Sequence, residues 1–173
     1  TYNLDIPSRE AGETIDDVMD KYYGRFKSKQ RRQFKKDVRT IDQMIEEGEL
    51  EVVIDTGDKL DDGLAFLALY EDEMDAKAKG RKPLFDAIRR DGGLTEFLKN
   101  NRQGVYLRRK VDGKILGGLI VKRLGSKYSI GFAATDSQER GSIRSIQFYL
   151  MQTMIRQSID EGKRELSYGV DTN

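Results

Sequence analysis

The sequence predicts an α/β (α+β) fold in which a mixed, mainly antiparallel central sheet is flanked by helices. Three observations lead to this prediction: strand-like runs joined by tight turns between residues 104 and 134, a long amphipathic helix after them, and a further strand-like run after that helix. Strands joined by tight turns run antiparallel, whereas a crossover helix returns the chain to the sheet in a parallel orientation. The sheet is therefore expected to be mixed.

The first helix is expected over residues 25–45, after an N-terminal stretch, residues 1–20, that is the most loop-like part of the chain. Phe34, Val38, Ile41 and Ile45 recur at helical spacing and form a stripe that must face a core. The basic residues of the same helix then lie on its solvated side: Arg25, Lys27, Lys29, Arg31, Arg32, Lys35, Lys36 and Arg39.

The middle of the chain predicts a strand, a helix and a further helix. Gly48 ends the first helix and residues 50–54 form the strand. Asp58 is placed to cap the next helix, whose buried stripe is Leu60, Leu64, Leu67, Tyr70 and Met74. The further helix starts near Gly80 and Pro83 and ends at Gly92-Gly93.

An alternative function for the middle segment is a paired-carboxylate hydrolase site built from Asp58, Asp61 and Asp62. Helix capping explains the same residues, because acidic groups stabilise the first turn of a helix. We therefore favour the structural interpretation.

The strands of the last third are the most clearly marked. Residues 104–111 and 114–121 flank Asp112-Gly113, a dipeptide that tolerates the positive φ angles of a type I′ hairpin turn. After a second turn at residues 124–127, the large residues Tyr128, Ile130, Phe132 and Ala134 alternate with small ones, which predicts a strand with large groups on one face. Glycines at 117, 118 and 131 allow a close approach to the sheet.

A long helix follows, and the segment before it predicts a phosphate site. Apolar residues recur at helical spacing from Ile143 to Gly162, a left-handed C-cap, and residues 165–170 form the last strand. The connection, residues 138–144, places a glycine and two arginines where a helix begins, and helix N-termini favour anions.

Composition bounds the chemistry. The chain has 173 residues, 37% of them hydrophobic, and a formal net charge of +1, so it can hold one sizeable core and has no global electrostatic preference. It contains neither His nor Cys, which excludes thiol nucleophiles, Ser-His-Asp triads and His- or thiolate-bound zinc. No apolar run is long enough to span a bilayer, and the lack of Cys fits a cytoplasmic protein.

Residues 104–169, in this order, resemble the central part of the GCN5-related N-acetyltransferase (GNAT) fold. The GNAT loop pattern Gln/Arg-x-x-Gly-x-Gly/Ala aligns with Gln138 and Gly141, whereas Ile143 stands where the pattern has a small residue. The whole chain resembles the FemAB/BioF2-like (GNAT_6-type) subgroup, on the basic helix, the helix at residues 66–74 and the ending at residues 166–173. We expect one GNAT-like domain over residues 1–173, the second of a longer protein, with residues 1–20 a linker or remnant and the C-terminal strands truncated.

The resemblance implies an N-acyltransferase that moves an acyl group from acetyl-CoA or another acyl-CoA, without a metal, to an amine acceptor. It implies a donor-binding loop made of Gln138, Arg140, Gly141, Ser142 and Arg144. Tyr168 and Asp171, on and after the last strand, become candidates for proton transfer. The acceptor would be an amine-bearing small molecule, a peptide or a cell-envelope precursor.

Two alternatives stay open on the sequence alone. Aminoacyl-tRNA is the donor for some Fem-type relatives, and the basic helix, residues 25–39, is either a tRNA contact or an ordinary solvated face; the helical-hairpin insertion of those relatives is not evident here. A catalytically degenerate GNAT-like domain acting as a binding or scaffold module is the other alternative, and the departure at Ile143 allows it.

Overall fold

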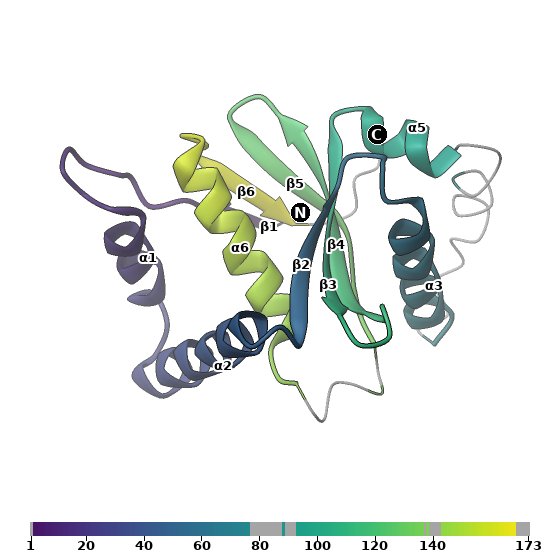
Figure 1. Ribbon diagram of the computed structural model, residues 1–173. Coiled ribbons are helices and arrows are strands. Elements are labelled where there is room, and N and C mark those ends of the chain that lie inside the picture. Colours follow the sequence, from purple (N-terminus) through teal and green to yellow (C-terminus); the bar gives the residue numbers. More distant parts are fainter. Residues whose placement is uncertain (1, 77–87, 89–92, 137, 139–142, 169–173) are drawn as a thin grey trace.

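The computed structural model describes residues 2–76, 88, 93–136, 138 and 143–168. We keep the element labels of Figure 1. The helices and strands in these ranges are β1 (Tyr2–Asp5), α1 (Ile15–Tyr23), α2 (Ser28–Glu46), β2 (Leu50–Asp55), α3 (Leu60–Ala76), α5 (Gly93–Lys99), β3 (Arg102–Arg109), β4 (Ile115–Leu124), β5 (Lys127–Thr135), α6 (Ile146–Asp160) and β6 (Glu165–Tyr168).

The strands form a six-stranded sheet in the order β1-β6-β5-β4-β3-β2. The β2–β3, β3–β4, β4–β5 and β1–β6 pairs are antiparallel, and β5–β6 is parallel. The parallel pair is the one connected by the crossover helix α6, as the order of elements requires. The predicted mixed, mainly antiparallel sheet is confirmed.

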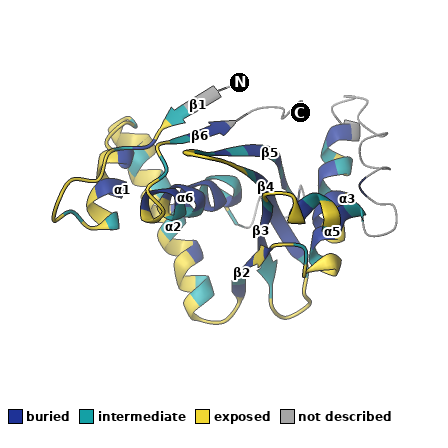
Figure 2. Ribbon diagram, turned by 90° about the horizontal axis from the view of Figure 1, so that it is seen from above, coloured by how far each residue is buried: buried dark blue, intermediate teal, exposed yellow. Residues whose placement is uncertain are grey.

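Helices cover both faces of the sheet, as Figures 1 and 2 show. Ile41 of α2, Leu119 of β4 and Leu150 of α6 belong to one buried cluster, whereas Phe66 of α3 and Tyr106 of β3 belong to another on the opposite face. Helices α1, α2 and α6 therefore form one layer, and α3 and α5 form the other. The sheet is the middle layer.

Helix α2 packs on α6 through aromatic side chains. Phe34 of α2 stacks on Phe148 of α6 with ring centroids 3.9 Å apart and an interplanar angle of 7°. The predicted stripe of α2 faces this core, since Ile41 is buried and Phe34, Val38 and Ile45 pack partly buried against the same cluster. This packing places α2 beside the start of α6.

Strand β5 contains a bulge that corrects the predicted side-chain pattern. Val121 of β4 pairs with Ile130, and its neighbour Ile120 pairs with Phe132, so Gly131 is an extra residue without a partner in β4. An extra residue reverses the alternation of faces beyond it. Ile130 accordingly faces the α6 side and Phe132 faces the α3 side, so the prediction that residues 128–134 keep their large groups on one face is wrong.

The structure adds elements in regions where the sequence pattern was weak. Residues 1–20 were expected to be loop-like, yet β1 pairs with β6 and α1 begins at Ile15. Thr14 and Asp17 form a capping box that starts α1. The helix expected between Gly80 and Gly93 lies almost entirely outside the described residues, and α5 begins where that helix was expected to end.

Helix α3 buries a different stripe from the predicted one. Leu67, Tyr70 and Met74 are buried as expected, but Leu60 and Leu64 are exposed, at 48% and 37%. Gly63 turns toward the sheet instead, with a position for Cβ only 3.3 Å from the hydroxyl of a sheet tyrosine and 2.8 Å from a leucine of α5. The absence of a side chain at this position allows the helix to approach closely, which a hydrophobic pattern does not reveal.

Asp58 and Asp62 have structural partners. The Asp58 carboxylate accepts a hydrogen bond from the Thr56 amide instead of capping α3, and Asp62 in the first turn forms a 2.8 Å ion pair with Arg108. The cap-like contact comes from the buried Asp55, which accepts from the backbone amide of Lys59 at 3.1 Å. These contacts favour the structural interpretation of the acids.

Two predicted boundaries shift. Residues 110–114 connect β3 to β4, and Gly113 has a positive φ of 71° while Asp112 does not, so the connection is a longer loop and not a type I′ turn. Helix α6 begins at Ile146 instead of Ile143, because Ser145 adopts a left-handed conformation. Its end at Gly162, with φ of 71°, is as predicted.

Candidate functional site

The start of α6 lies between two clefts. One has a volume of about 440 Å³ and is lined by α2 and the residues that precede α6: Gln33, Lys36, Asp37, Thr40, Ile41, Met44, Ile143 and Arg144. The other has a volume of about 350 Å³ and is lined by the end of β5, the start of α6 and one residue of α3: Glu73, Ala133, Ala134, Thr135, Ile143, Ser145, Ile146 and Gln147. We call them the α2 cleft and the β5 cleft.

Ser145 determines how the chain enters α6. Its backbone has φ of 62° and ψ of 32°, a left-handed conformation that costs a non-glycine residue about 1–2 kcal/mol. Its hydroxyl does not cap the helix; it donates a 2.6 Å hydrogen bond to Oδ2 of Asp37 in α2. The other oxygen of Asp37 accepts from the Gln33 amide at 2.8 Å. This carboxylate is 7% exposed.

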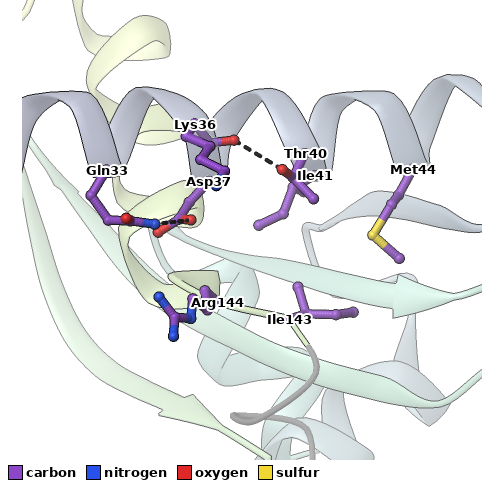
Figure 3. A pocket seen from close by; sticks show the side chains of 8 residues that line it. All are labelled: Gln33, Lys36, Asp37, Thr40, Ile41, Met44, Ile143 and Arg144. Atoms are coloured by element: carbon purple, nitrogen blue, oxygen red, sulfur yellow. Dashed lines mark hydrogen bonds between the residues drawn. The ribbon is translucent and has the colours of Figure 1, made fainter.

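Figure 3 shows the α2 cleft from close by, with Lys36 and Asp37 on the helix above and Arg144 below. Lys36 and Arg144 are both exposed, and neither forms an ion pair with another described residue. Asp37 receives hydrogen bonds from neutral donors only among the described contacts. The cleft therefore holds two cations and one carboxylate beside the start of a helix, and this excess of positive charge favours an anionic ligand group.

The β5 cleft borders a stretch of β5 that has no β6 partner among the described residues. Strand β6 pairs with β5 only from Lys127 to Ile130 in the described part, whereas β5 continues to Thr135. The Oγ1 atom of Thr135 is buried and has no hydrogen-bond partner within the described residues. Gln147 of α6 donates its side-chain amide to the carbonyl of Ala134. Backbone groups beyond the Gly131 bulge are thus placed where an extended ligand could bind along β5.

The loop before α6 is anchored where it leaves the sheet. The amide of Asp136 donates to the carbonyl of Leu116, and the Asp136 carboxylate accepts from the backbone amide of Gln138 at 2.8 Å. The same carboxylate lies 3.3 Å from Nζ of Lys114. Because Asp136 is only 8% exposed, this anchor is a buried, hydrogen-bonded carboxylate.

The structure describes two of the predicted donor-binding residues, Gln138 and Arg144. Gln138 is exposed at the start of the loop, and Arg144 is exposed in the α2 cleft. Arg140, Gly141 and Ser142 lie outside the described residues, so their role stays a prediction. For the proton-transfer candidates, the backbone of Tyr168 ends β6 opposite Ile130 of β5, and Asp171 also lies outside the described residues.

Several residues of the site were not singled out from the sequence. Lys36 was grouped with the other cations of the basic helix, and Asp37 and Ser145 carried no motif that predicts their contact. Thr135 and Gln147 flank the predicted loop without belonging to it. Contacts between positions 37 and 145 are set by the packing of α2 on α6, and a single sequence holds no signal for them.

Tyrosines near the site are held protonated. Burial raises the pKa of Tyr149 above its ordinary value, and its hydrogen bond to the carboxylate of Asp42 raises it further. Burial also raises the pKa of Tyr23. Neither phenol is therefore suited to act as a base near neutral pH.

Comparison with known proteins identifies the family of the chain. The sequence model of the acetyltransferase (GNAT) domain matches residues 28–173. No curated protein sequence matches the chain significantly. No described helix is both long and apolar enough to cross a bilayer.

Solved structures share the fold at low sequence identity. An aminoglycoside acetyltransferase (meta-AAC0020) from an uncultured soil metagenomic sample, in complex with sisomicin, is 18% identical, with a TM-score of 0.54 over 73% of this chain and 80% of that one. GCN5 from Tetrahymena is 12% identical, with a TM-score of 0.55 over 70% and 71%. The C-terminal domain of a candidate lysylphosphatidylglycerol synthetase from Agrobacterium fabrum is 13% identical, with a TM-score of 0.51 over 83% and 43%.

Proposed function

The chain belongs to the acetyltransferase (GNAT) domain family, and we propose that it transfers an acyl group from acyl-CoA to an amine. The observation that carries the proposal is the start of α6, where two exposed cations without ion-pair partners in the described chain line one cleft and the end of β5, which has no β6 partner among the described residues, lines the other. A donor with a phosphate-bearing end and an amide-containing arm suits these two surfaces. We further propose that residues 1–173 form one domain of the FemAB/BioF2-like subgroup.

The reaction does not require the His and Cys side chains that the protein lacks. The amine lone pair attacks the thioester carbonyl carbon, the carbon–sulfur bond breaks, the thiolate of CoA leaves, and the amine nitrogen loses a proton. The protein aligns the two reactants and stabilises the developing oxyanion. A chain without His or Cys can supply both effects with backbone amides and cations.

In this proposal, the phosphates of the donor bind at residues 138–144, with Arg140 and Arg144 as charged partners. Charge-assisted hydrogen bonds of this kind contribute about 1.5–3 kcal/mol each. The amide-containing arm then runs along β5 beyond the Gly131 bulge, toward the hydroxyl of Thr135. The family membership and the two clefts support these positions.

Proton removal is assigned to residues on and after β6 in the sequence, with a further candidate in α3. Tyr168 and Asp171 are the candidates from the sequence, and either acts directly or through water. Glu73 of α3 adds a carboxylate to the described lining of the β5 cleft. Comparing Tyr168→Phe, Asp171→Asn and Glu73→Gln in single-turnover transfer identifies which of them shapes the pH profile.

Two alternatives are tied to particular observations. The exposed cations of α2 support aminoacyl-tRNA as a donor, and tRNA binding would fall steeply with salt. Ile143, which lines both clefts where the family pattern has a small residue, supports a binding or scaffold module that has lost the donor. Acceptor classes stay those of the sequence prediction: an amine-bearing small molecule, a peptide or a cell-envelope precursor.

The test combines donor binding with transfer. Calorimetric titration of the full chain with CoA is expected to give saturable binding, and Arg144→Ala and Arg140→Ala are each expected to weaken it by about 1–3 kcal/mol. Arg39→Ala is the matched control, because this arginine of α2 is exposed and lines neither cleft. Release of free thiol from acetyl-CoA is then followed with a panel of amines that includes an aminoglycoside. Absence of CoA binding would refute the proposal and favour the scaffold alternative that has lost the donor, and CoA binding without thiol release for any amine of the panel would contradict the transfer activity.

A further inference from the structure

Two carboxylates of α2 reach α6, and they contact it at different places. Asp37 accepts a hydrogen bond from Ser145, immediately before the helix begins. Asp42 accepts one from the hydroxyl of Tyr149, inside the helix. Both contacts link α2 to α6. If they served only to pack these two helices together, removing either contact would be expected to have the same effect.

Asp37 differs from Asp42 in burial. Asp37 is 7% exposed, whereas Asp42 is exposed to solvent. A buried carboxylate is costly unless hydrogen bonds satisfy it. The bonds from Gln33 and Ser145 supply this satisfaction, and Gln33 at the same time fixes the orientation of the carboxylate. The side chain is therefore held in one place against the residue that precedes α6.

Ser145 is also the residue whose backbone sets the direction of the chain into α6. A left-handed conformation at a non-glycine residue persists only when its surroundings favour it. The bond to Asp37 is the one described side-chain contact of Ser145. Arg144 and Ile143, which line the α2 cleft, directly precede this residue, so their placement depends on its conformation.

We propose that Asp37 is a positioning residue for the donor site: through Ser145 it holds the residues that enter α6 in the geometry that accepts the phosphate-bearing end of the donor. The inference rests on the proposed function for the identity of that donor. Under this proposal, α2 contributes to the donor site, although it lies outside the loop at residues 138–144 by which such a site is recognised in the sequence.

The test compares matched variants of the full chain. Asp37→Ala removes the contact at the helix entry, and Asp42→Ala removes the contact farther along α6. Asp37→Asn keeps an oxygen that accepts from Ser145 and serves as the conservative variant. Backbone hydrogen exchange of residues 149–152 is measured without ligand, because the Tyr149 amide donates the first helical hydrogen bond of α6, to the carbonyl of Ser145. CoA affinity is measured by calorimetry. Circular dichroism confirms that each variant is folded.

Asp37→Ala is expected to accelerate exchange at residues 149–152 and to weaken CoA binding about tenfold, a common size for coupling between contacting groups. Asp37→Asn is expected to lose less than Asp37→Ala, and Asp42→Ala to stay within about twofold of the wild type. Ser145→Ala is expected to reproduce Asp37→Ala, and the double variant to be no weaker than either single one.

The outcomes separate this inference from the proposed function. Unchanged exchange at residues 149–152 in Asp37→Ala, or equal effects of Asp37→Ala and Asp42→Ala on CoA affinity, would overturn the positioning role. If the wild type does not bind CoA, the proposed function fails, and the exchange measurement still decides whether Asp37 organises the entry to α6.

Discussion

Two adjacent glycines of β4, Gly117 and Gly118, face opposite sides of the sheet. A side chain added at Gly117 would press on the start of α6, beside the proposed donor site, whereas one added at Gly118 would press on the opposite layer. A Cβ atom on Gly117 would lie 2.7 Å from Cγ2 of Ile146, the first residue of α6, and 3.2 Å from the carbonyl oxygen of Ala134. A Cβ atom on Gly118 would lie 2.7 Å from a ring carbon of Phe66, on the opposite face. Both contacts are well below the usual carbon–carbon separation of about 3.5–4.0 Å.

The expected loss of stability is similar for the two substitutions. Overpacking a buried position costs about 1–3 kcal/mol, partly offset by about 0.4–1 kcal/mol because alanine restricts the unfolded chain. The net loss is therefore at most about 2.6 kcal/mol, which lowers the melting temperature by up to about 10 °C in a domain of this size. Gly117→Ala and Gly118→Ala are thus expected to unfold at similarly reduced urea concentrations.

Their effects on the donor should differ. Gly117→Ala displaces Ile146 and with it the entry to α6, so CoA affinity is expected to fall about tenfold or more. Gly118→Ala displaces the core under α3 and is expected to leave CoA affinity within about threefold. Urea unfolding and calorimetric titration of both variants provide the measurement. Equal losses of affinity, or a larger loss for Gly118→Ala, would refute the placement of the donor beside the start of α6.

Three further predictions concern stability and pH. Tyr106→Phe removes a 2.8 Å hydrogen bond to the fully buried carboxylate of Asp55 and is expected to destabilise the fold by about 1–3 kcal/mol in urea unfolding, whereas no change would mean that water replaces the phenol. The hydrogen bond from Arg109, with a further one from a backbone amide, lowers the pKa of Asp112 to about 2. The stability that this contact gives the hairpin is therefore fully present above the ordinary pKa of a carboxyl group and is lost as pH falls through about 2. A carboxyl carbon NMR titration midpoint near 4 would contradict this prediction. Ser145→Gly relieves a left-handed strain of about 1–2 kcal/mol but loses the side-chain hydrogen bond to α2. The free energy of unfolding should therefore change by less than about 1 kcal/mol, while CoA binding weakens. Unchanged CoA binding would show that the bond does not position the site.

The last third of the chain could be predicted well because its signals are local. Alternation, turn glycines and helical spacing act over a few residues, and they placed β3, β4, β5, α6 and β6 in the right order. The mixed sheet followed from that order. The bulge at Gly131 could not be predicted, because it depends on how β5 pairs with β4.

The N-terminal region shows where local signals fail. Strand β1 is only four residues long and becomes a strand by pairing with β6, 160 or more positions away in sequence. The capping box of Thr14 and Asp17 is a local signal for α1 that was available and was missed. Helix α5 was missed because Gly93 suggested an end where the structure has a beginning.

The candidate site was predictable in outline. Arg144 could be placed beside the start of a helix, because residue order alone puts it there. Asp37 and Lys36 could not be assigned to the site, since they reach it only through the packing of α2 on α6. The apolar stripe of α2 predicts that this helix packs on a core, but it does not say which residues of that core its polar side chains meet.

Hydrogen exchange of the wild-type chain with and without saturating CoA tests the central claim most directly. If the donor lies along the open end of β5 and against the entry to α6, CoA should slow the exchange of backbone amides at residues 131–135 and 143–148 and leave β2 and β3 unchanged. Protection confined to other elements, or no protection at a CoA concentration that saturates calorimetric binding, would contradict the account.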